Sequence, residues 1–424
     1  MKMIYVRAGM TPLDAQPVDA VIRRNLFGFN SGNLLFQYSV FRTLMVDDTA
    51  FDARPTATVA GSPELIERMN AEYNCAVFPM ANAFRDGFNL KKVSALIRSL
   101  KIPCVVVGCG LQAAGPEAIR EGFPFDDDAR KFVNAVLDKS AMLGLRGEYT
   151  AEYLKKLGYA PERHFTVIGC PSLFRNGPTL PAPNPAPITA ATRFSINTLP
   201  VQRPELNGLI ARTERQYPDF HLVLQEQREL AMVAFGTINP IRDAGRDQTG
   251  YYPFNHLHRD VRAGRVIGFT QARAWFEYMH TVDYSFGSRL HGNLAAVTCG
   301  TPAFVFTSDT RTEEICRYAN IPHMPVSDLK PDADIRQLLE GADFGGVCRG
   351  YAERFNHYVD FLNRNGLDHI YAHPVPPEGV PFDRAEAALP ADGLVRQGCL
   401  KPMKALDGRL DFYKRKLKKK LKRR

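Results

Sequence analysis

The residues best suited to chemistry lie at 287–300, which read GSRLHGNLAAVTCG. They follow the apolar run VDYSF and open a helix-like stretch, a junction where α/β proteins bind ligands and where helix N-termini favour anions. Arg289 can clamp a carboxylate or phosphate, and His291 can transfer a proton near neutral pH. The alternative is a capping serine, a surface arginine and a histidine satisfied by backbone. The other candidate donor-binding residues here are Ser288, Gly292 and Asn293.

Two turns in the first half also follow predicted strands. Arg146 lies in residues 145–154, LRGEYTAEYL, after a short strand and at a helix start, where it can face a cleft. The alternative is a helix-start ion pair with Glu148. Cys170 ends a strand in the turn GCPS, and we interpret it as a small buried thiol rather than a nucleophile.

Glycines follow predicted structure at two other places. In residues 30–37, NSGNLLFQ, Gly32 and Asn33 can let the backbone approach an anion, although a plain N-cap is the alternative. In residues 107–112, VGCGLQ, Gly108 and Gly110 follow a strand without the third glycine of a dinucleotide fingerprint.

Aromatic and histidine side chains gather in residues 251–258, YYPFNHLH. Aromatic faces can stack on sugar rings, so Tyr251, Tyr252 and His256 are candidate acceptor-binding residues. A partly buried loop is the alternative. His256 and His258 lack acidic or cysteine partners, and we predict no metal site.

Short apolar runs alternate with helix-like stretches, which indicates βαβ units and mostly parallel sheets in an α/β protein. Five prolines in residues 177–187, GPTLPAPNPAP, interrupt the alternation as a stiff linker. Two α/β halves joined in this way predict a ligand cleft at their interface. We expect an N-terminal domain at 1–176, a linker at 177–192, a second domain with the SRLHGN motif at 193–365, and an extension at 366–424.

The positions of the predicted elements follow from this alternation. Predicted strands are 76–80, 103–108, 142–145 and 166–169 in the first half, and 193–197, 221–225, 265–269, 282–286 and 303–307 in the second. Predicted helices are 90–100, 127–141, 205–217, 271–280 and 290–299.

Composition favours a cytoplasmic protein of two domains. The chain has 424 residues, of which 45% are hydrophobic, enough for two separate cores. No apolar run approaches the ~20 residues of a membrane helix, and the N-terminus has no signal-peptide core. Eight scattered cysteines without a CxxC pair indicate reduced, buried thiols.

The net charge of +9 belongs to the C-terminal tail. Nine of the 54 Lys and Arg residues lie between Lys414 and Arg424, which leaves 45 against 45 acidic residues in the rest of the chain. Apolar residues at helical spacing accompany these charges and predict an interfacial helix on an anionic membrane. A solvated charge run is the alternative, and no specific nucleic-acid binding is expected. The apolar stripe consists of Leu406, Leu410, Tyr413, Leu417 and Leu421.

The motifs, taken in order, resemble the polysaccharide pyruvyl transferase family. The matching pieces are SGNLLFQ, VGCGLQ, LRGEYTAEYLKKLG, VIGCPSLF and GSRLHGNLAAVTCGTPAF, spanning residues 31–304. The resemblance implies two facing Rossmann-like domains in a GT-B-like arrangement, and phosphoenolpyruvate as donor substrate without another cofactor. It implies that the family's important arginine and histidine are Arg146 and His291, with Arg289 alongside. SGNLLFQ departs from the Gly-Asp pair that many members carry.

The resemblance predicts a pyruvyl transferase that forms a pyruvate ketal on two hydroxyls of a sugar and releases phosphate. The sugar would belong to a surface polysaccharide, such as an exopolysaccharide, or to its lipid-linked precursor, and the enzyme would be peripheral at the inner face of the plasma membrane. His291 would protonate the donor, while Arg146 and Arg289 would hold its anionic groups. The alternatives are a GT-B glycosyltransferase that uses a nucleotide sugar and a non-catalytic binding protein on the same fold.

Overall fold

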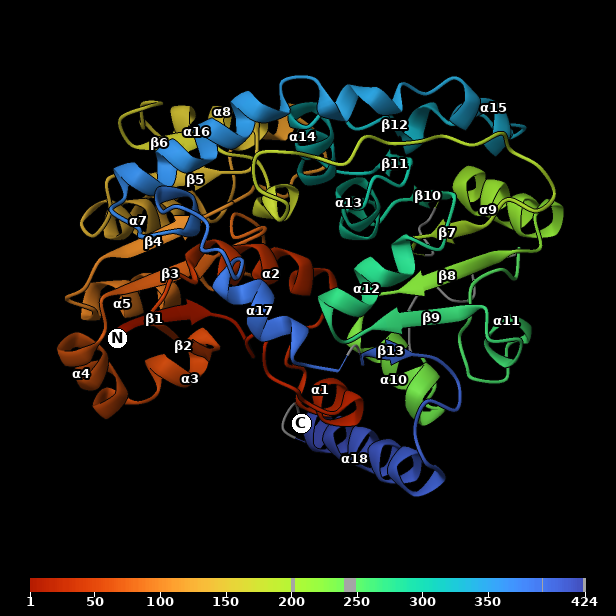
Figure 1. Ribbon diagram of the computed structural model, residues 1–424, viewed down its shortest axis with the longest axis horizontal. Coiled ribbons are helices and arrows are strands. Elements are labelled where there is room, and N and C mark those ends of the chain that lie inside the picture. Colours follow the sequence, from red (N-terminus) through yellow and green to blue (C-terminus); the bar gives the residue numbers. More distant parts are fainter. Residues whose placement is uncertain (200–202, 240–248, 391, 422–424) are drawn as a thin grey trace.

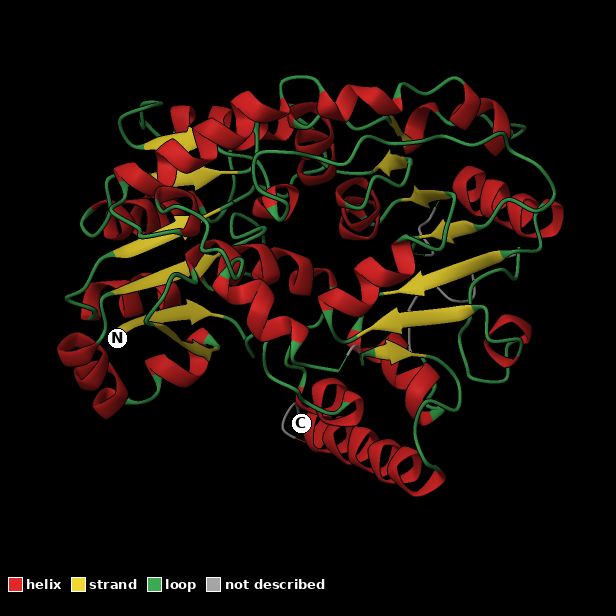
Figure 2. Cartoon of the chain, in the orientation of Figure 1, coloured by secondary structure: helices red, strands yellow, loops and turns green. Residues whose placement is uncertain are grey.

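The computed structural model describes residues 1–199, 203–239, 249–390 and 392–421, with the backbone alone at 419 and 420. Two groups of strands, each flanked by helices, form the two halves of the molecule (Figure 2). The α/β class with mostly parallel sheets, predicted from the sequence, is confirmed. Every predicted strand and helix overlaps an observed one, whereas the strands Lys2–Arg7, Thr49–Arg54, His323–Pro325 and Leu394–Val395 were not predicted.

The first sheet has four parallel strands in the order β2-β1-β3-β4. A parallel bridge between Cys109 and Leu145 places the paired strands β5 and β6 beyond β4. Strand β4 is buried at every position, as its sequence CVVV suits a strand covered on both faces. The strands are β1 (Lys2–Arg7), β2 (Thr49–Arg54), β3 (Cys75–Pro79), β4 (Cys104–Val107), β5 (Leu143–Leu145) and β6 (Phe165–Val167).

The helices of the first half connect these strands and cover them. Their bounds are α1 (Val18–Arg24), α2 (Gly32–Leu44), α3 (Thr56–Ala60), α4 (Pro63–Glu72), α5 (Leu90–Ser99), α6 (Glu117–Glu121), α7 (Asp126–Leu137), α8 (Glu148–Lys156) and the 3₁₀ helix η1 (Pro171–Phe174).

The second sheet has seven strands in the order β12-β11-β10-β7-β8-β9-β13, and only β13 runs antiparallel to its neighbour. The strands are β7 (Phe194–Ile196), β8 (Phe220–Leu224), β9 (Val266–Phe269), β10 (Tyr284–Gly287), β11 (Ala303–Thr307), β12 (His323–Pro325) and β13 (Leu394–Val395).

The helices that follow along the chain are α9 (Pro204–Gln216), α10 (Gln227–Phe235), α11 (Arg259–Arg262), α12 (Ala272–Met279), α13 (Leu290–Thr298), α14 (Thr310–Tyr318), α15 (Ile335–Glu340), α16 (Tyr351–Arg364), α17 (Pro381–Ala387) and α18 (Pro402–Leu421), with 3₁₀ helices η3 (Val326–Asp328), η4 (Phe344–Cys348) and η5 (Ile370–Ala372).

Each sheet contains one point where the strand order reverses. In the first sheet the chain leaves β1 for β2 on one side and returns to β3 on the other. In the second it runs β7, β8, β9 and then returns to β10 beside β7, which is the strand order of the Rossmann fold. The arrows of β1 and of β8 and β9 point toward the middle of the molecule (Figure 1), so the carboxyl ends of the two sheets face each other. Ligands of open α/β sheets bind at such reversal points.

The two halves share a hydrophobic core. One cluster of buried side chains runs from one face of the first sheet, through α2, into the second sheet, and a separate cluster covers the other face of the first sheet. Helix α2 lies between the two sheets in Figure 1. This packing holds the two sets of strand ends at a fixed separation.

Helix α16 crosses back from the second half to the first. His357 contacts the Thr166 hydroxyl at 2.7 Å, and Arg364 pairs with Glu162 at 2.8 Å. The proline-rich segment 178–189 has no regular secondary structure, as expected for a linker. The domain limits stay a prediction, and these contacts favour grouping α16 with the first sheet instead of the second.

Candidate active site

The SRLHGN turn lies at the reversal point of the second sheet, against Asn197, the residue that follows β7. Gly287 has φ 138°, and a Cβ there would lie 2.2 Å from the Asn197 carbonyl oxygen. A Cβ on Gly292 would lie 1.9 Å from the Asn197 side-chain oxygen. The Arg289 backbone N–H donates to the Asn197 carbonyl at 2.8 Å. The glycines in this turn are therefore required by close packing onto Asn197.

Arg289, a predicted donor ligand, is buried in an internal ion pair. Its Nη2 lies 2.6 Å from Oε1 of Glu229, and its Nε donates to the Thr198 carbonyl at 3.0 Å. Although burial lowers the pKa of Arg289, the charge of Glu229 raises it above the ordinary value. Nη1 has no hydrogen-bond partner within the described part of the chain. Much of the charge of Arg289 is thus compensated before any ligand arrives.

The polar side chains beside Arg289 are also used internally. The Asn293 amide donates to the carbonyls of Gly287 and Arg289 and accepts from the Ser285 hydroxyl at 2.8 Å. Ser288 lies 3.2 Å from the Thr198 hydroxyl. The structure therefore gives Asn293 a role in shaping the turn, and a donor contact at Ser288 or Gly292 stays a prediction.

Arg146, at the carboxyl end of β5, is completely buried. Its Nε donates to the Gly108 carbonyl at 3.1 Å, and its Nη2 contacts the Cys170 sulfur at 3.4 Å. The guanidinium carbon lies 5.2 Å from the centre of the Phe36 ring. Its Nη1 has no hydrogen-bond partner among the residues described. This nitrogen is a buried donor that an anionic ligand would satisfy.

His291, in the first turn of α13, shares its electrostatic environment with Arg146. Burial lowers the pKa of the His291 imidazole well below its usual 6.5, and the charges of Arg146 and Arg311 lower it further. Its Nε2 is buried and has no partner in the described ranges. Two side chains that the sequence separates by more than a hundred residues thus lie close enough to influence each other.

The glycines and Asn33 of the first half support this arrangement through close contacts. A Cβ on Gly32 would lie 2.7 Å from the His291 Cβ, and one on Gly110 would lie 3.0 Å from the Arg146 Cδ. Gly108 has φ 66°, and a Cβ added there would clash with the side chains of Pro171 and Phe36. The Asn33 amide donates to the carbonyls of Phe27 and Gly28. Backbone contacts of these residues with a donor stay a prediction.

Glu314, on α14 of the second half, was missed by sequence reasoning. Its carboxyl group accepts hydrogen bonds from the Thr150 N–H at 3.0 Å and from the Thr150 hydroxyl. Burial raises the pKa of Glu314 to about 8, even though Thr150 and the charge of Arg146 lower it. The side chain is therefore mostly protonated at neutral pH. It joins the two halves beside the Arg146 guanidinium.

Three arginines near the first sheet were missed as well. Arg7 ends β1, Arg85 follows β3, and Arg311 lies in the first turn of α14. The only sequence signal was an arginine directly after a strand or at a helix start, a pattern common elsewhere in the chain.

The predicted acceptor surface requires a correction. Tyr251 and Tyr252 are both 0% exposed, and Tyr252 hydrogen-bonds to the buried Glu229. Because neither ring presents a free face, neither residue is available to stack on a sugar. His256 is partly buried, with its Nδ1 unpartnered within the described ranges. An acceptor role for His256 stays a prediction.

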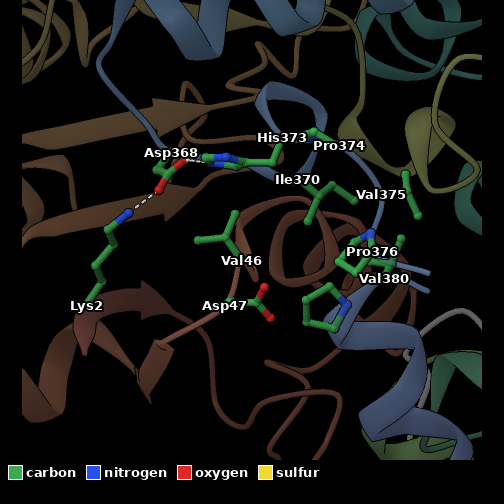
Figure 3. Close-up of a pocket in the computed structure, with 11 residues that line it drawn as sticks. Lys2, Val46, Asp47, Asp368, Ile370, His373, Pro374, Val375, Pro376 and Val380 are labelled. Atoms are coloured by element: carbon green, nitrogen blue, oxygen red, sulfur yellow. Dashed lines mark hydrogen bonds and ion pairs between the residues drawn. The ribbon is translucent and has the colours of Figure 1, made fainter. Parts of the chain in front are cut away.

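Two cavities lie outside the Arg146 and His291 side chains: one is distant from the site, and the other borders it through Glu226, whose Oε1 lies 4.0 Å from Arg289 Nη2. One, of about 190 Å³, adjoins Lys2 at the amino end of β1, with Asp368 paired to Lys2 and His373 (Figure 3). A larger one, of about 810 Å³, lies between α1, α10 and α18 and includes Phe29 and Asn30. The first is at the wrong end of the sheet for a ligand site of an open α/β sheet. No group of three or more His, Cys, Asp or Glu side chains in the described ranges is arranged to hold a metal.

Comparisons with known proteins identify a family. The model of the family described as polysaccharide pyruvyl transferase matches residues 51–310. A search of curated proteins finds no match. Among solved structures, UDP-GlcNAc 2-epimerase from Methanocaldococcus jannaschii is 10% identical, with TM-score 0.46 and coverage of 86% of this chain and 99% of that one. The enzyme of the same name from Neisseria meningitidis is 11% identical, with TM-score 0.43 and coverage of 86% and 100%. At these identities and TM-scores, the similarity supports no conclusion about the function of this chain.

Proposed function

The chain belongs to the polysaccharide pyruvyl transferase family, and from this membership we propose that it transfers the enolpyruvyl unit of phosphoenolpyruvate to a sugar. Two hydroxyls of the sugar become bridged by a pyruvate ketal, and phosphate is released. The observation that carries this proposal is that Arg146 and His291 each keep one nitrogen, Nη1 and Nε2, without a partner among the described residues, and that the charge of Arg146 acts on His291. Both nitrogens are buried.

Phosphoenolpyruvate fits these two groups because it is small and carries a carboxylate and a phosphate. A buried guanidinium satisfies such an anion with charge-assisted hydrogen bonds. Burial and two positive neighbours lower the pKa of His291, which favours its neutral form. An incoming phosphate would offset the charges of Arg146 and Arg311. Donor binding itself would therefore raise the pKa of His291 and favour protonation of its imidazole.

The reaction then follows from the positions of these groups. His291 protonates the CH2 carbon of the donor, which leaves an oxocarbenium-like centre at C2. One sugar hydroxyl adds to C2 and loses its proton, the C2–O bond to phosphate breaks, and the second hydroxyl adds in the same way. Of the two hydroxyl protons, one replaces the proton given by His291 and the other leaves with phosphate. Arg146 stabilises the charge on the departing phosphate.

The test measures pyruvyl transfer from phosphoenolpyruvate to a panel of lipid-linked and nitrophenyl glycosides by mass spectrometry and phosphate release. His291→Ala and Arg146→Lys are the test variants, and His280→Gln, an exposed histidine at the end of α12, is the matched control. We expect transfer by the wild type and the control and a strong loss in both test variants. Near wild-type turnover in folded His291→Ala and Arg146→Lys would reject the assignment. Release of a nucleotide from a nucleotide sugar, without phosphoenolpyruvate turnover, would favour a glycosyltransferase instead.

We also propose that α18 attaches the enzyme to an anionic membrane. The helix docks through Gly408, whose close approach to Phe235 leaves no room for a Cβ, and through Arg409, which donates to the Phe235 carbonyl at 2.7 Å. The apolar stripe is left exposed, from 39% at Tyr413 to 66% at Leu421. A basic helix that shows apolar side chains to solvent is suited to an interface with anionic lipids. Lys422, Arg423 and Arg424 lie outside the described residues.

The membrane proposal has its own test, which does not depend on activity. In flotation with vesicles rich in phosphatidylglycerol, we expect the full chain to float with the vesicles. A variant lacking residues 414–424 should remain in the unbound fraction. A second variant, Leu417→Ser with Leu421→Ser, keeps every charge and should float less. Unchanged binding in both variants would reject the proposal. No helix in the described part of the chain is long and apolar enough to cross a membrane.

A further inference from the structure

The reversal point of the first sheet carries two arginines, Arg7 and Arg85, that the proposed donor site leaves unused. Arg7 is the last residue of β1, and its Nη1 donates to the carbonyl of Pro79, the last residue of β3, at 3.3 Å. It therefore spans the crevice between these two strands. The order β2-β1-β3-β4 makes this crevice the ligand position expected of the sheet.

A second arginine lies over the same aromatic ring. The guanidinium carbons of Arg7 and Arg85 are each 5.8 Å from the centre of the Phe88 ring. Both arginines are only partly buried, so solvent reaches them. The Arg85 Nε is a buried atom with no hydrogen-bond partner in the described ranges. One aromatic face compensates a guanidinium weakly compared with a carboxylate.

Arg311 brings positive charge to this place from the other half of the molecule. It lies at the start of α14, where its Nη2 pairs with Asp309 at 3.2 Å and its Nε has no partner in the described part of the chain. Its charge lowers the pKa of both Arg85 and His291, although burial is the larger cause in each case. Arg311 therefore connects the first reversal point with the donor site.

The balance of charge in this cluster favours an anionic ligand. Burial lowers the pKa of Arg7, and the charge of Arg85 lowers it further, so the two cations repel each other. Among the described residues, Asp309 is the one carboxylate with an ion pair to the cluster, and it contacts Arg311 alone. Like charges held together without carboxylates are unfavourable until an anion binds between them.

We propose that Arg7 and Arg85, together with Arg311, which also borders the donor site, form a subsite for a phosphate or diphosphate group carried by the acceptor sugar. This inference rests on the proposed function, because it assumes that a sugar must reach the donor beside His291. The proposed function assigns the anionic groups of phosphoenolpyruvate to Arg146 and His291, which leaves Arg7 and Arg85 available to the second substrate. A diphosphate linked to a lipid and one linked to a nucleoside share the chemistry that this subsite recognises.

The first test uses inorganic pyrophosphate and titration calorimetry, with the full-length protein saturated with phosphoenolpyruvate. We expect pyrophosphate to bind the wild type, and to bind Arg85→Gln about tenfold more weakly, since one charge-assisted contact is lost. Arg85→Lys, which keeps the charge, should retain most of the affinity. The control is Arg130→Gln, a surface arginine of α7 that pairs with Asp127. Equal affinity in the wild type and Arg85→Gln, or no pyrophosphate binding at all, would overturn the subsite.

The second test separates the substrates kinetically, with one sugar offered as a free glycoside, a nucleoside diphosphate sugar and a polyprenyl diphosphate sugar. In Arg85→Gln we expect KM for the diphosphate acceptors to rise about tenfold while KM for phosphoenolpyruvate changes less than twofold. A preference between the two diphosphates identifies the source of the group. A parallel rise in KM for phosphoenolpyruvate would assign the cluster to the donor and overturn the inference. If phosphoenolpyruvate is never turned over, the proposed function fails, while the calorimetry still decides whether the cluster binds diphosphate.

Discussion

The two reversal points face each other across the molecule, but their charges are compensated differently. At the second sheet, Arg289 is paired with the buried Glu229, and the turn closes tightly on Asn197. At the first sheet, Arg7 and Arg85 share an aromatic ring and have no ion pair with a described carboxylate. The region with the recognisable motif is thus largely satisfied by its own residues, while the region without a motif holds uncompensated charge.

This difference separates two uses of arginine in one fold. A buried arginine that is paired with a buried carboxylate fixes the shape of a turn, and its loss mainly lowers stability. A partly exposed arginine without a carboxylate is available to a ligand, and its loss mainly weakens binding. Arg146 and His291 lie between these cases, because each has a buried nitrogen without a partner among the described residues, as Arg289 does, but no ion pair with a described carboxylate.

The largest effect is expected where the two halves meet, at His291. His291→Ala should lower kcat by about 10²–10⁴-fold, the usual contribution of a positioned proton donor. Single-turnover measurements with a sugar acceptor check this, and the Tm of the variant shows whether it is folded. A folded His291→Ala with kcat close to that of the wild type would place proton transfer elsewhere.

Stability should respond most at the paired reversal point. Arg289→Met leaves the Glu229 carboxylate buried without its partner, and we expect a loss of about 3–5 kcal/mol in the free energy of unfolding. Adding Glu229→Gln should recover part of this loss. Arg228→Met, which breaks the more exposed pair with Glu226, is the control and should cost at most about 1 kcal/mol. Urea denaturation measures all four proteins, and equal losses in Arg289→Met and Arg228→Met would remove the distinction.

The pH dependence of stability tests the contact between the halves at Glu314. Its pKa of about 8 in the folded protein exceeds its ordinary 4.5, so the folded state retains a proton that the unfolded state has lost. The contribution to stability is therefore complete below about pH 4.5 and declines as pH rises toward 8, by at most about 1.4 kcal/mol per pH unit. In Glu314→Gln this decline should disappear. The same slope in both proteins would show that Glu314 is not held protonated beside Arg146 and Asp309.

The smallest effect on stability is expected at the unpaired reversal point. Arg85 donates no side-chain hydrogen bond to a described residue, so Arg85→Gln should change the free energy of unfolding by no more than about 0.5 kcal/mol. In the same urea denaturation series, Arg85→Gln should show the smallest loss in the free energy of unfolding and Arg289→Met the largest. A loss comparable to that of Arg289→Met would mean that Arg85 has a structural role instead of a ligand.

The sequence predicted the parts of the fold that apolar runs determine. Strand β4, with four consecutive apolar residues, was found almost to the residue, whereas β2 was missed because its sequence TAFDAR is half-buried throughout and mixes charges with apolar residues. Helix α16 was not predicted from the sequence. Local patterns do not show which sheet such an element joins.

For the site, the sequence identified the residues within the motifs and missed those that only the strand order brings together. Arg146 and His291 each followed a predicted strand and were found. Arg85 and Arg311 lie more than two hundred residues apart in ordinary contexts, and the interaction between their charges depends on how the strands of the two sheets are ordered. Tyr251 and Tyr252 were misassigned, because aromatic residues in a polar segment look the same whether the loop is exposed or folded into the core.

Titration of the His291 imidazole by NMR, with and without phosphoenolpyruvate, tests most directly whether Arg146 and His291 receive the donor together. In the free protein the imidazole should stay neutral well below pH 6.5, because burial and the charges of Arg146 and Arg311 oppose its protonation. Saturating phosphoenolpyruvate should raise this pKa, as the bound phosphate offsets those charges. A His291 that titrates near its usual pKa and does not respond to phosphoenolpyruvate would contradict the account.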